Sequence, residues 1–378
     1  MNLRTTFDRI MSYEPFERLP VWYFGTWSAT LERWKTEGLS SEDAIPQETG
    51  MDPDWEKGKR NAHGLMNFRP ITGMETTTIK EDEHQITART YLGDIIRWNK
   101  GEESMPETVQ YALKPTRQSW DSFKKYLDPT YALRYKPGWE KQAEAFEGRT
   151  HATCFVAGSL YGWPRDWMGV EEWSVLFYDN PALAEEIIDT LTNYFIEIYR
   201  PLLKKTRFEF GYFNEDCCFN TGPLLPPNIY RDMFDTYYRR LVSFYKDNGV
   251  KCLLVDSDGK LDDLIPCWLD SGIDAVFPVE VGTWKAHAPA LRKHFGKSLR
   301  MIGGVDKHVI PKGEGAIRKE LEPLVSLAEE GGYIPLPDHR IPPDCSLEQF
   351  RTYVRVFKSV FKNTGYENDR NFKMELTY

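Results

Sequence analysis

Side chains able to do acid–base chemistry follow, one after another, the short apolar segments in the second half of the chain. Carboxylates and histidine exchange protons near neutral pH and bind divalent metals. The residues placed in this way are Asp216, Asp256, Asp258, Glu280, Asp306 and His339. From this set we expect the catalytic residues to be His339, Asp256, Glu280 and Asp216.

Carboxylates gathered in one concave site repel each other, so one of them takes up a raised pKa or a cation neutralises the group. Asp256, Asp258, Glu280 and His339 together offer oxygen ligands and one imidazole. This set suits a divalent ion, zinc first, although its spacing is no metal motif by itself. No Walker loop, dinucleotide glycine motif or Ser-His-Asp pattern is present, so no nucleotide cofactor is expected.

Each of these residues also has a structural interpretation, which the sequence leaves open. Asp258 could cap the helix that follows it, and Asp306 could cap a turn or pair with the next lysine. Asp216 and Glu215 could form a solvated pair in a loop, and His339 could be a structural histidine. The other histidines lie in expected helices, hairpins or connections: His63, His84, His151, His287, His294 and His308.

These side chains can meet only if the segments before them are parallel strands. After about residue 150, apolar segments alternate with amphipathic helical segments, which predicts strand–helix units with right-handed crossovers. In a barrel of such units, all strands end at one mouth. The predicted strands are 152–157, 208–213, 251–255, 275–279, 299–302 and 333–336. The predicted helices are 181–205, 227–248, 261–271, 284–295, 314–330 and 346–362.

The first part of the chain is less regular. Residues 21–24 predict a seventh strand, and an eighth is expected between residues 60 and 80. Alternating polar and apolar residues over 74–100 predict antiparallel hairpins. We therefore expect an α/β fold, a (β/α)8 TIM barrel with an N-terminal β-hairpin excursion. One domain would span 1–378, with an irregular part (1–150), regular units (151–362) and a surface tail (363–378).

Composition narrows the classes of function. The net charge is −9, and the lysines and arginines are scattered, which does not suit a nucleic-acid surface. No apolar run could span a membrane, and the start lacks the apolar stretch of a signal peptide, which predicts a cytoplasmic protein. Cys154, Cys252 and Cys267 are expected to be reduced core residues. For Cys217-Cys218 a packing role is favoured over a redox role.

Several segments resemble the uroporphyrinogen decarboxylase superfamily. They are 158–169 (GSLYGWPRDWMG), 220–227 (NTGPLLPP), 237–240 (YYRR), 303–307 (GGVDK) and 332–344, which contains Asp338-His339-Arg340. The resemblance implies a (β/α)8 barrel with a deep cleft, often dimeric, so a homodimer is possible. The superfamily holds the haem-pathway decarboxylase and cobalamin-dependent methyltransferases.

Departures from the family pattern separate these branches. The decarboxylase follows its first Pro-Val-Trp with two arginines that hold substrate carboxylates, whereas 20–28 reads PVWYFGTWS, without arginine. The methyltransferases carry a His-x-Cys-Gly zinc motif, where this sequence has Asp256-Ser257-Asp258-Gly259. The missing arginines place the chain closer to the corrinoid-dependent methyltransferase branch. The replaced zinc motif argues against activation of a thiol, and a harder site would instead activate an ether or amine. The resemblance implies methyl transfer from a small methoxylated or methylated substrate to a corrinoid protein. The alternatives are a decarboxylase acting on a smaller acid and a non-catalytic ligand-binding barrel.

Aromatic side chains near the expected strand ends could line a pocket for an aromatic or methylated compound. About half of them would equally serve as ordinary core. The expected substrate-binding residues are Trp22, Tyr23, Trp27, Tyr161, Trp163 and Arg165, with Trp284 as a further pocket aromatic.

Overall fold

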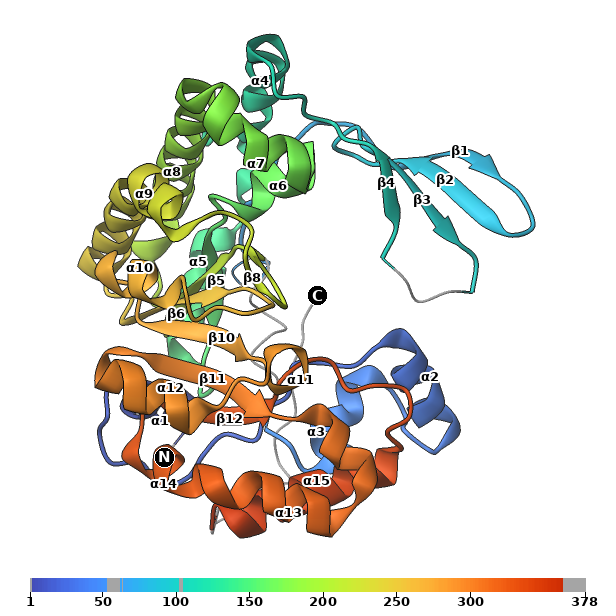
Figure 1. Ribbon diagram of the computed structural model, residues 1–378, viewed down its shortest axis with the longest axis vertical. Coiled ribbons are helices and arrows are strands. Elements are labelled where there is room, and N and C mark those ends of the chain that lie inside the picture. The colour runs from blue at the N-terminus through green and yellow to red at the C-terminus, as the bar shows by residue number, and fades with distance from the viewer. Residues whose placement is uncertain (1, 53–61, 63, 102–104, 363–378) are drawn as a thin grey trace.

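Six parallel strands form the central sheet of the computed structural model, which describes residues 2–52, 62, 64–101 and 105–362 (Figure 1). Neighbouring strands follow one another in the chain, apart from a small hairpin between two of them. All adjacent pairs are parallel, so their carboxyl ends lie at one edge. The strands are β5 (Cys154–Gly158), β6 (Phe210–Asn214), β9 (Cys252–Asp256), β10 (Ala275–Val279), β11 (Arg300–Val305) and β12 (Tyr333–Pro337), and the hairpin is β7 (Cys218–Phe219) with β8 (Gly222–Pro223).

Helices follow every strand of this sheet. Side-chain caps define two of their starts: Asn180 accepts from Leu183 N, and Ser346 forms a capping box with Gln349. The helices are α6 (Gly162–Met168), α7 (Val170–Asp179), α8 (Pro181–Leu203), α9 (Pro227–Asp247), α10 (Ile265–Asp270), α11 (Val281–Trp284), α12 (Ala288–Phe295), α13 (Glu314–Leu321), α14 (Val325–Glu330) and α15 (Leu347–Val360). The six predicted strand–helix units are thus confirmed.

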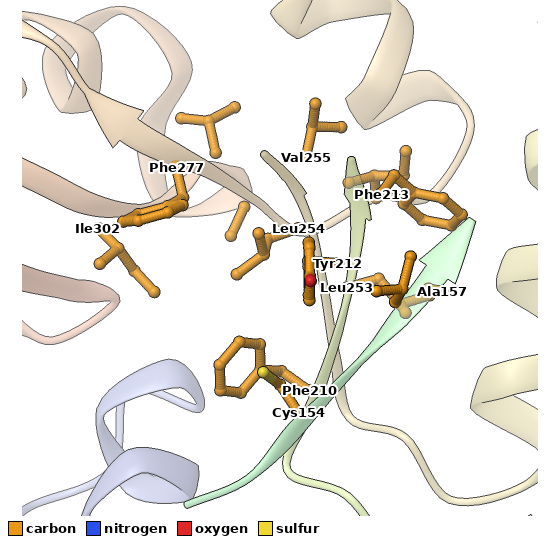
Figure 2. Close-up of a cluster of buried hydrophobic side chains, with 14 of the residues drawn as sticks. Cys154, Ala157, Phe210, Tyr212, Phe213, Leu253, Leu254, Val255, Phe277 and Ile302 are labelled. Carbon is orange, nitrogen blue, oxygen red and sulfur yellow. The ribbon is translucent and has the colours of Figure 1, made fainter. Parts of the chain in front are cut away.

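The two faces of the sheet pack against different partners. On β6, Phe213 meets Tyr238 of α9, with ring centroids 5.2 Å apart. Phe210 instead stacks on Phe7 of α1 (Leu3–Met11) at 4.7 Å. Because side chains alternate along a strand, Phe210 and Tyr212 belong to the inner face and Phe213 to the helix-covered face. Figure 2 shows these side chains among those of the neighbouring strands. The buried core is therefore two layers deep, as a barrel requires.

The segment predicted as a seventh strand, 21–24, forms no regular strand. Its backbone is held by a side chain instead, since Val21 N donates to Asp52 Oδ2 and Asp52 N donates to Val21 O. A single parallel bridge, Thr26 to Ile341, places the end of this segment beside the chain that leaves β12. The segment therefore lies where the predicted strand would lie, but without ladder hydrogen bonds.

The antiparallel excursion is confirmed. Four strands pair in the order β1–β2–β3–β4 and project from the barrel body (Figure 1). They are β1 (Thr77–Glu81), β2 (Gln85–Arg89), β3 (Ile95–Asn99) and β4 (Glu107–Gln110). The remaining helices of the first part are α2 (Ser28–Thr36), α3 (Ile45–Thr49), α4 (Arg117–Phe123) and α5 (Trp139–Ala145).

Two predicted helices are broken. The helix expected over 284–295 is α11 and α12, because Lys285 has φ +58° and ends α11, and His287 caps α12. The helix expected over 314–330 is α13 and α14, with Pro323 in the turn between them.

Three further expectations concern the tail, His63 and the eighth strand. The surface tail at 363–378 and His63 lie outside the described residues. In the described part of 60–80, no parallel strand is assigned, and Met66 makes one antiparallel bridge to Tyr135. Within the described residues, no helix has both the length and the apolar composition needed to cross a membrane.

The amino-terminal end of the sheet is closed by a buried ion cluster. Glu209, whose side chain is fully buried, receives Arg149 Nη2 at 2.9 Å and Arg4 Nε at 2.7 Å. Thr153 N also donates to it, at 2.8 Å. The cluster joins α1 to the starts of β5 and β6. The cluster therefore fixes the end of the sheet that lies opposite to the carboxyl ends of the strands.

Replacing Glu209 by alanine should lower the free energy of unfolding by about 3–5 kcal/mol, because the buried Arg149 would lose its carboxylate and Arg4 would keep only Glu147. Urea unfolding at neutral pH measures this change. Glu144→Ala is the matched control, since Glu144 pairs with Lys205 at the surface and its loss should cost less than about 1 kcal/mol. Equal effects of the two substitutions would contradict the structural role of Glu209.

Candidate active site

Asp258, Glu280 and His339 come together at the carboxyl ends of β9, β10 and β12. Each offers a ligand atom, and these atoms all lie within 4.8 Å of one another. His339 Nε2 is 3.4 Å from Asp258 Oδ2. The His339 side chain is 17% exposed and that of Asp258 47%, so a small molecule can reach the group from solvent. Figure 1 shows the arrowheads of β10 and β12 pointing to the side on which α11 lies.

The loop that carries Asp258 is tied to the next strand. Gly259 N donates to Glu280 Oε2 at 2.7 Å. Gly259 has φ +89°, and a Cβ there would lie 2.6 Å from Cys218 O, so no other residue fits. Asp258 is not a helix cap, because α10 begins later, at Ile265. The structural alternative for Asp258 is therefore wrong.

The charge of this group is poorly compensated. Burial and the nearby negative charge of Asp258 raise the pKa of Glu280, against the opposing effect of its hydrogen bond from Gly259. Such a site favours either a proton or a cation between the two carboxylates.

Aromatic rings flank His339. Its imidazole stacks on Phe24 with centroids 4.4 Å apart, and Phe24 in turn stacks on Phe277 at 5.1 Å. Trp27 lies 6.1 Å from the imidazole, and the Arg340 guanidinium lies over the Trp27 ring at 5.5 Å. Trp27 is thus the predicted aromatic nearest to the cluster. Phe24 was missed, because its place beside His339 depends on a contact between the two ends of the chain.

Asp256 ends β9 and is half-buried. It pairs in register with Asn214 of β6 and Phe277 of β10, so it belongs to the inner face of the sheet. It is not one of the three clustered ligands. Asp256 is the register partner of Phe277, Phe277 stacks on Phe24, and Phe24 stacks on His339. Asp256 and His339 therefore lie at the same mouth of the barrel. Its catalytic and ligand roles stay predictions.

Asp216 lies beside the cluster rather than in it. The backbone of Asp216 has φ +40°, and its side-chain Oδ1 accepts a hydrogen bond from Asp258 N at 3.3 Å. Arg165 donates to its backbone oxygen and lies 3.5 Å from its carboxylate. Burial and the charge of Asp258 raise the pKa of Asp216. Arg165 thus contacts an acid of the site, and its role toward substrate stays a prediction.

Glu215, for which a solvated loop pair with Asp216 was one alternative, is fully buried. Its carboxylate accepts from Leu160 N, Tyr161 N and Gly162 N, at 2.7–2.9 Å, and from Tyr238 OH at 2.7 Å. Burial raises the pKa of Glu215, and these four donors oppose that effect. The residue therefore holds the loop after β5 against β6, and the solvated alternative is wrong.

Asp338 performs the same task at the end of β12, four strands along the sheet from β6. Its Oδ2 accepts from Val281 N and Gly282 N, both at 2.8 Å, and its Oδ1 accepts from Lys307 N at 3.2 Å. One carboxylate thus joins the loops after β10, β11 and β12. Asp306 caps the turn after β11 by accepting a hydrogen bond from His308 N, which agrees with one of the two structural alternatives for this residue.

Most of the predicted pocket aromatics are core residues. Trp22, Tyr23 and Tyr161 are at most 5% exposed and Trp163 is 9% exposed. Trp163, for example, packs on Phe195 of α8 at 4.9 Å. Trp284 is half-buried, and its Nε1 has no hydrogen-bond partner in the described part of the chain.

All six cysteines are buried, and none of them forms a disulfide within the described residues. Cys217 N donates to Ser257 Oγ at 3.0 Å, and burial raises the pKa of the Cys217 thiol. A thiol with a raised pKa is a poor nucleophile and a poor redox group. The packing role predicted for Cys217-Cys218 is therefore favoured.

Comparisons with known proteins give one family match. Residues 152–360 match the family model described as uroporphyrinogen decarboxylase (URO-D). A sequence search of curated proteins found no match.

Solved structures share the fold at low identity. A methyltransferase from Methanosarcina mazei superposes with a TM-score of 0.61 at 12% identity, covering 96% of this chain and 99% of that one. A B12-independent methionine synthase from Shewanella sp. W3-18-1 gives a TM-score of 0.47 at 13% identity, covering 92% and 97%. The first likeness supports the TIM-barrel class of the fold.

Gly259→Ala should displace the loop that carries Asp258. Gly249→Ala is the control, because Gly249 has φ +87° and a Cβ there would meet nothing within 4 Å. Both substitutions carry the strain of a left-handed residue, but only Gly259→Ala adds a backbone clash. We expect it to lose about 1–3 kcal/mol more in urea unfolding. Matching losses would mean that the loop yields freely.

The raised pKa of Glu280 makes stability depend on pH. At pH values below the ordinary pKa of a glutamate, Glu280 is protonated in both the folded and the unfolded state and does not lower the stability. As pH rises from that value through the raised pKa, the folded state holds the proton longer, so ionisation costs stability. Glu280→Gln should therefore gain stability over the parent through this window and keep the gain above it.

Urea unfolding of the two proteins from pH 4 to pH 8, with a chelator present, measures this difference. Glu348→Gln, at an exposed glutamate near Arg351, is the control. A difference between Glu280→Gln and the parent that stays constant across the range would rule out the proposed ionisation of Glu280.

Proposed function

The chain belongs to the uroporphyrinogen decarboxylase family, and from this premise we propose that it is a methyltransferase. It would move a methyl group from a small methoxylated or methylated substrate to a corrinoid carried by a partner protein. The observation that carries the proposal is the cluster of Asp258, Glu280 and His339 at the barrel mouth. The fold likeness to a protein described as a methyltransferase supports the choice of reaction.

The cluster fits a divalent metal ion by its chemistry. Two carboxylates and one imidazole match the donors of catalytic zinc sites, which keep one position open for water or substrate. The raised pKa of Glu280 is a second reason, because burial and the neighbouring Asp258 carboxylate both disfavour the ionised form of Glu280 unless a cation is present. We infer that Asp258, Glu280 and His339 would hold such an ion, with zinc first. When bound, it would act as a Lewis acid toward the substrate oxygen or nitrogen.

The chain's own residues then have separate tasks. Glu280 orients the loop of Asp258 through Gly259 N, and Phe24 fixes the plane of the His339 imidazole by stacking. Loss of a methyl group leaves a basic oxygen or nitrogen on the substrate, which must be protonated or stabilised. Asp256 is half-buried on the inner face beside Phe277 and would exchange that proton.

Substitution of the ligands tests the function. We expect the purified protein to methylate free cob(I)alamin from one or more members of a panel of methoxylated and methylated compounds. His339→Ala and Glu280→Ala should each reduce this rate by at least about 100-fold, since each removes a ligand. They should also reduce the zinc bound per chain.

The control is His294→Ala, which changes a histidine outside the cluster and should keep both zinc and rate. Absorbance of the corrinoid follows the methyl transfer, and elemental analysis gives the metal content. Carbon dioxide release from carboxylated compounds, with no methyl transfer across the panel, would replace methyl transfer by decarboxylation.

A further inference from the structure

We infer that Arg340 binds a carboxylate of the substrate, so that the protein acts on small organic acids. This assignment deepens the proposed function and rests on it for the place of the reacting group. The carboxylate would be a recognition group at the end of the substrate away from the Asp258–Glu280–His339 cluster.

The first argument is the position of Arg340. Its guanidinium lies over the ring of Trp27 at 5.5 Å, and Trp27 lies 6.1 Å from the His339 ring. His339 in turn meets Asp258 at 3.4 Å through Nε2. Contacts therefore run from Asp258 through His339 and Trp27 to Arg340. The acidic and the basic groups stand at opposite ends of this row, which suits a substrate with a reacting end and an anionic end.

The second argument is the missing counter-charge. Two other cations of the strand-end loops pair with acids: Arg165 with Asp166 at 2.7 Å, and Lys260 with Asp262 at 2.7 Å. Arg340 is half-buried, yet none of the carboxylates in the described residues lies within ion-pair distance of it. Within the described residues, its one hydrogen bond goes from Nη1 to Thr26 O at 3.1 Å. A guanidinium has five N–H donors, so most of them remain for a ligand.

The third argument is the surrounding backbone. Trp27 precedes α2, a helix of nine residues whose first turn receives no side-chain cap. The positive end of that helix adds to the field of the guanidinium, which lies over the same tryptophan. Figure 1 shows α2 on the side of the barrel toward which the strand arrowheads point.

A carboxylate fits this site better than a phosphate does. The planar guanidinium binds a planar carboxylate through two parallel hydrogen bonds. A phosphate monoester carries close to two negative charges and would be repelled more strongly by Asp258, Glu280 and Asp216. The rings of Trp27 and Phe24 suit an apolar body between the two ends of the ligand.

Binding of 4-methoxybenzoate and of the uncharged 4-methoxybenzamide to the full chain, loaded with zinc, tests the inference by calorimetry. We expect the acid to bind at least about tenfold more tightly, which is the usual strength of a hydrogen bond to a charged group. Arg340→Met should abolish this preference, and Arg340→Lys should keep part of it. Arg239→Met is the matched control, because Arg239 of α9 pairs with Asp235 at the surface and should leave the preference unchanged.

Thermal unfolding checks that each variant folds. Equal binding of acid and amide by the parent, or a preference that survives Arg340→Met, would overturn the inference. Tighter binding of 4-methoxyphenyl phosphate than of the acid would overturn the choice of carboxylate.

The corrinoid assay separates this inference from the proposed function. Methyl transfer from neutral methoxyarenes, without any preference for acids, would remove the role of Arg340 and leave the methyltransferase. Arg340-dependent binding of acids without methyl transfer from any compound would keep the acid site and remove the methyltransferase.

Discussion

Buried carboxylates that accept backbone N–H groups hold the mouth of this barrel together. Glu215 binds the loop after β5, Glu280 binds the loop after β9, and Asp338 binds the loops after β10 and β11. Loops at strand ends leave N–H groups without ladder partners, and burying them unpaired costs free energy. A carboxylate satisfies two or three of them at once and is itself stabilised by them. Each of these loops therefore depends on an acid that follows a later strand of the sheet.

The same arrangement concentrates negative charge. Glu215 has donors on both carboxylate oxygens, and these donors oppose the rise in its pKa that burial causes, so the residue is structural. Glu280 lies beside Asp258, whose negative charge adds to the effect of burial in raising the pKa of Glu280, and such a site attracts a cation. The division between structural and chemical acids at this mouth thus follows from the donors that each acid receives and from the charges beside it.

The contact between the two ends of the chain gives the site its other half. The bridge from Thr26 to Ile341 brings residues 24–27 against the loop after β12. Phe24 and Trp27 then flank His339, and Arg340 covers Trp27. The segment from 20 to 28 has no arginine of its own, which by sequence separated the chain from the haem-pathway decarboxylase. The tertiary contact instead brings Arg340 to this segment, where it donates a hydrogen bond to Thr26 O, 314 residues earlier in the chain.

The sequence by itself determined the parallel strand–helix units and the hairpin excursion, because their hydrophobic periodicity and caps are local. It also determined which acids follow each strand, and so named Asp258, Glu280 and His339. Only the tertiary structure decided which acids are hydrogen-bonded to backbone N–H groups and which aromatics belong to the core. It ruled out the solvated alternative for Glu215 and the helix-cap alternative for Asp258. Those outcomes depend on distances between loops of different strands, and no local pattern encodes them. The irregular path of 21–24 has the same cause, since Asp52, far along the chain, takes the hydrogen bond of Val21.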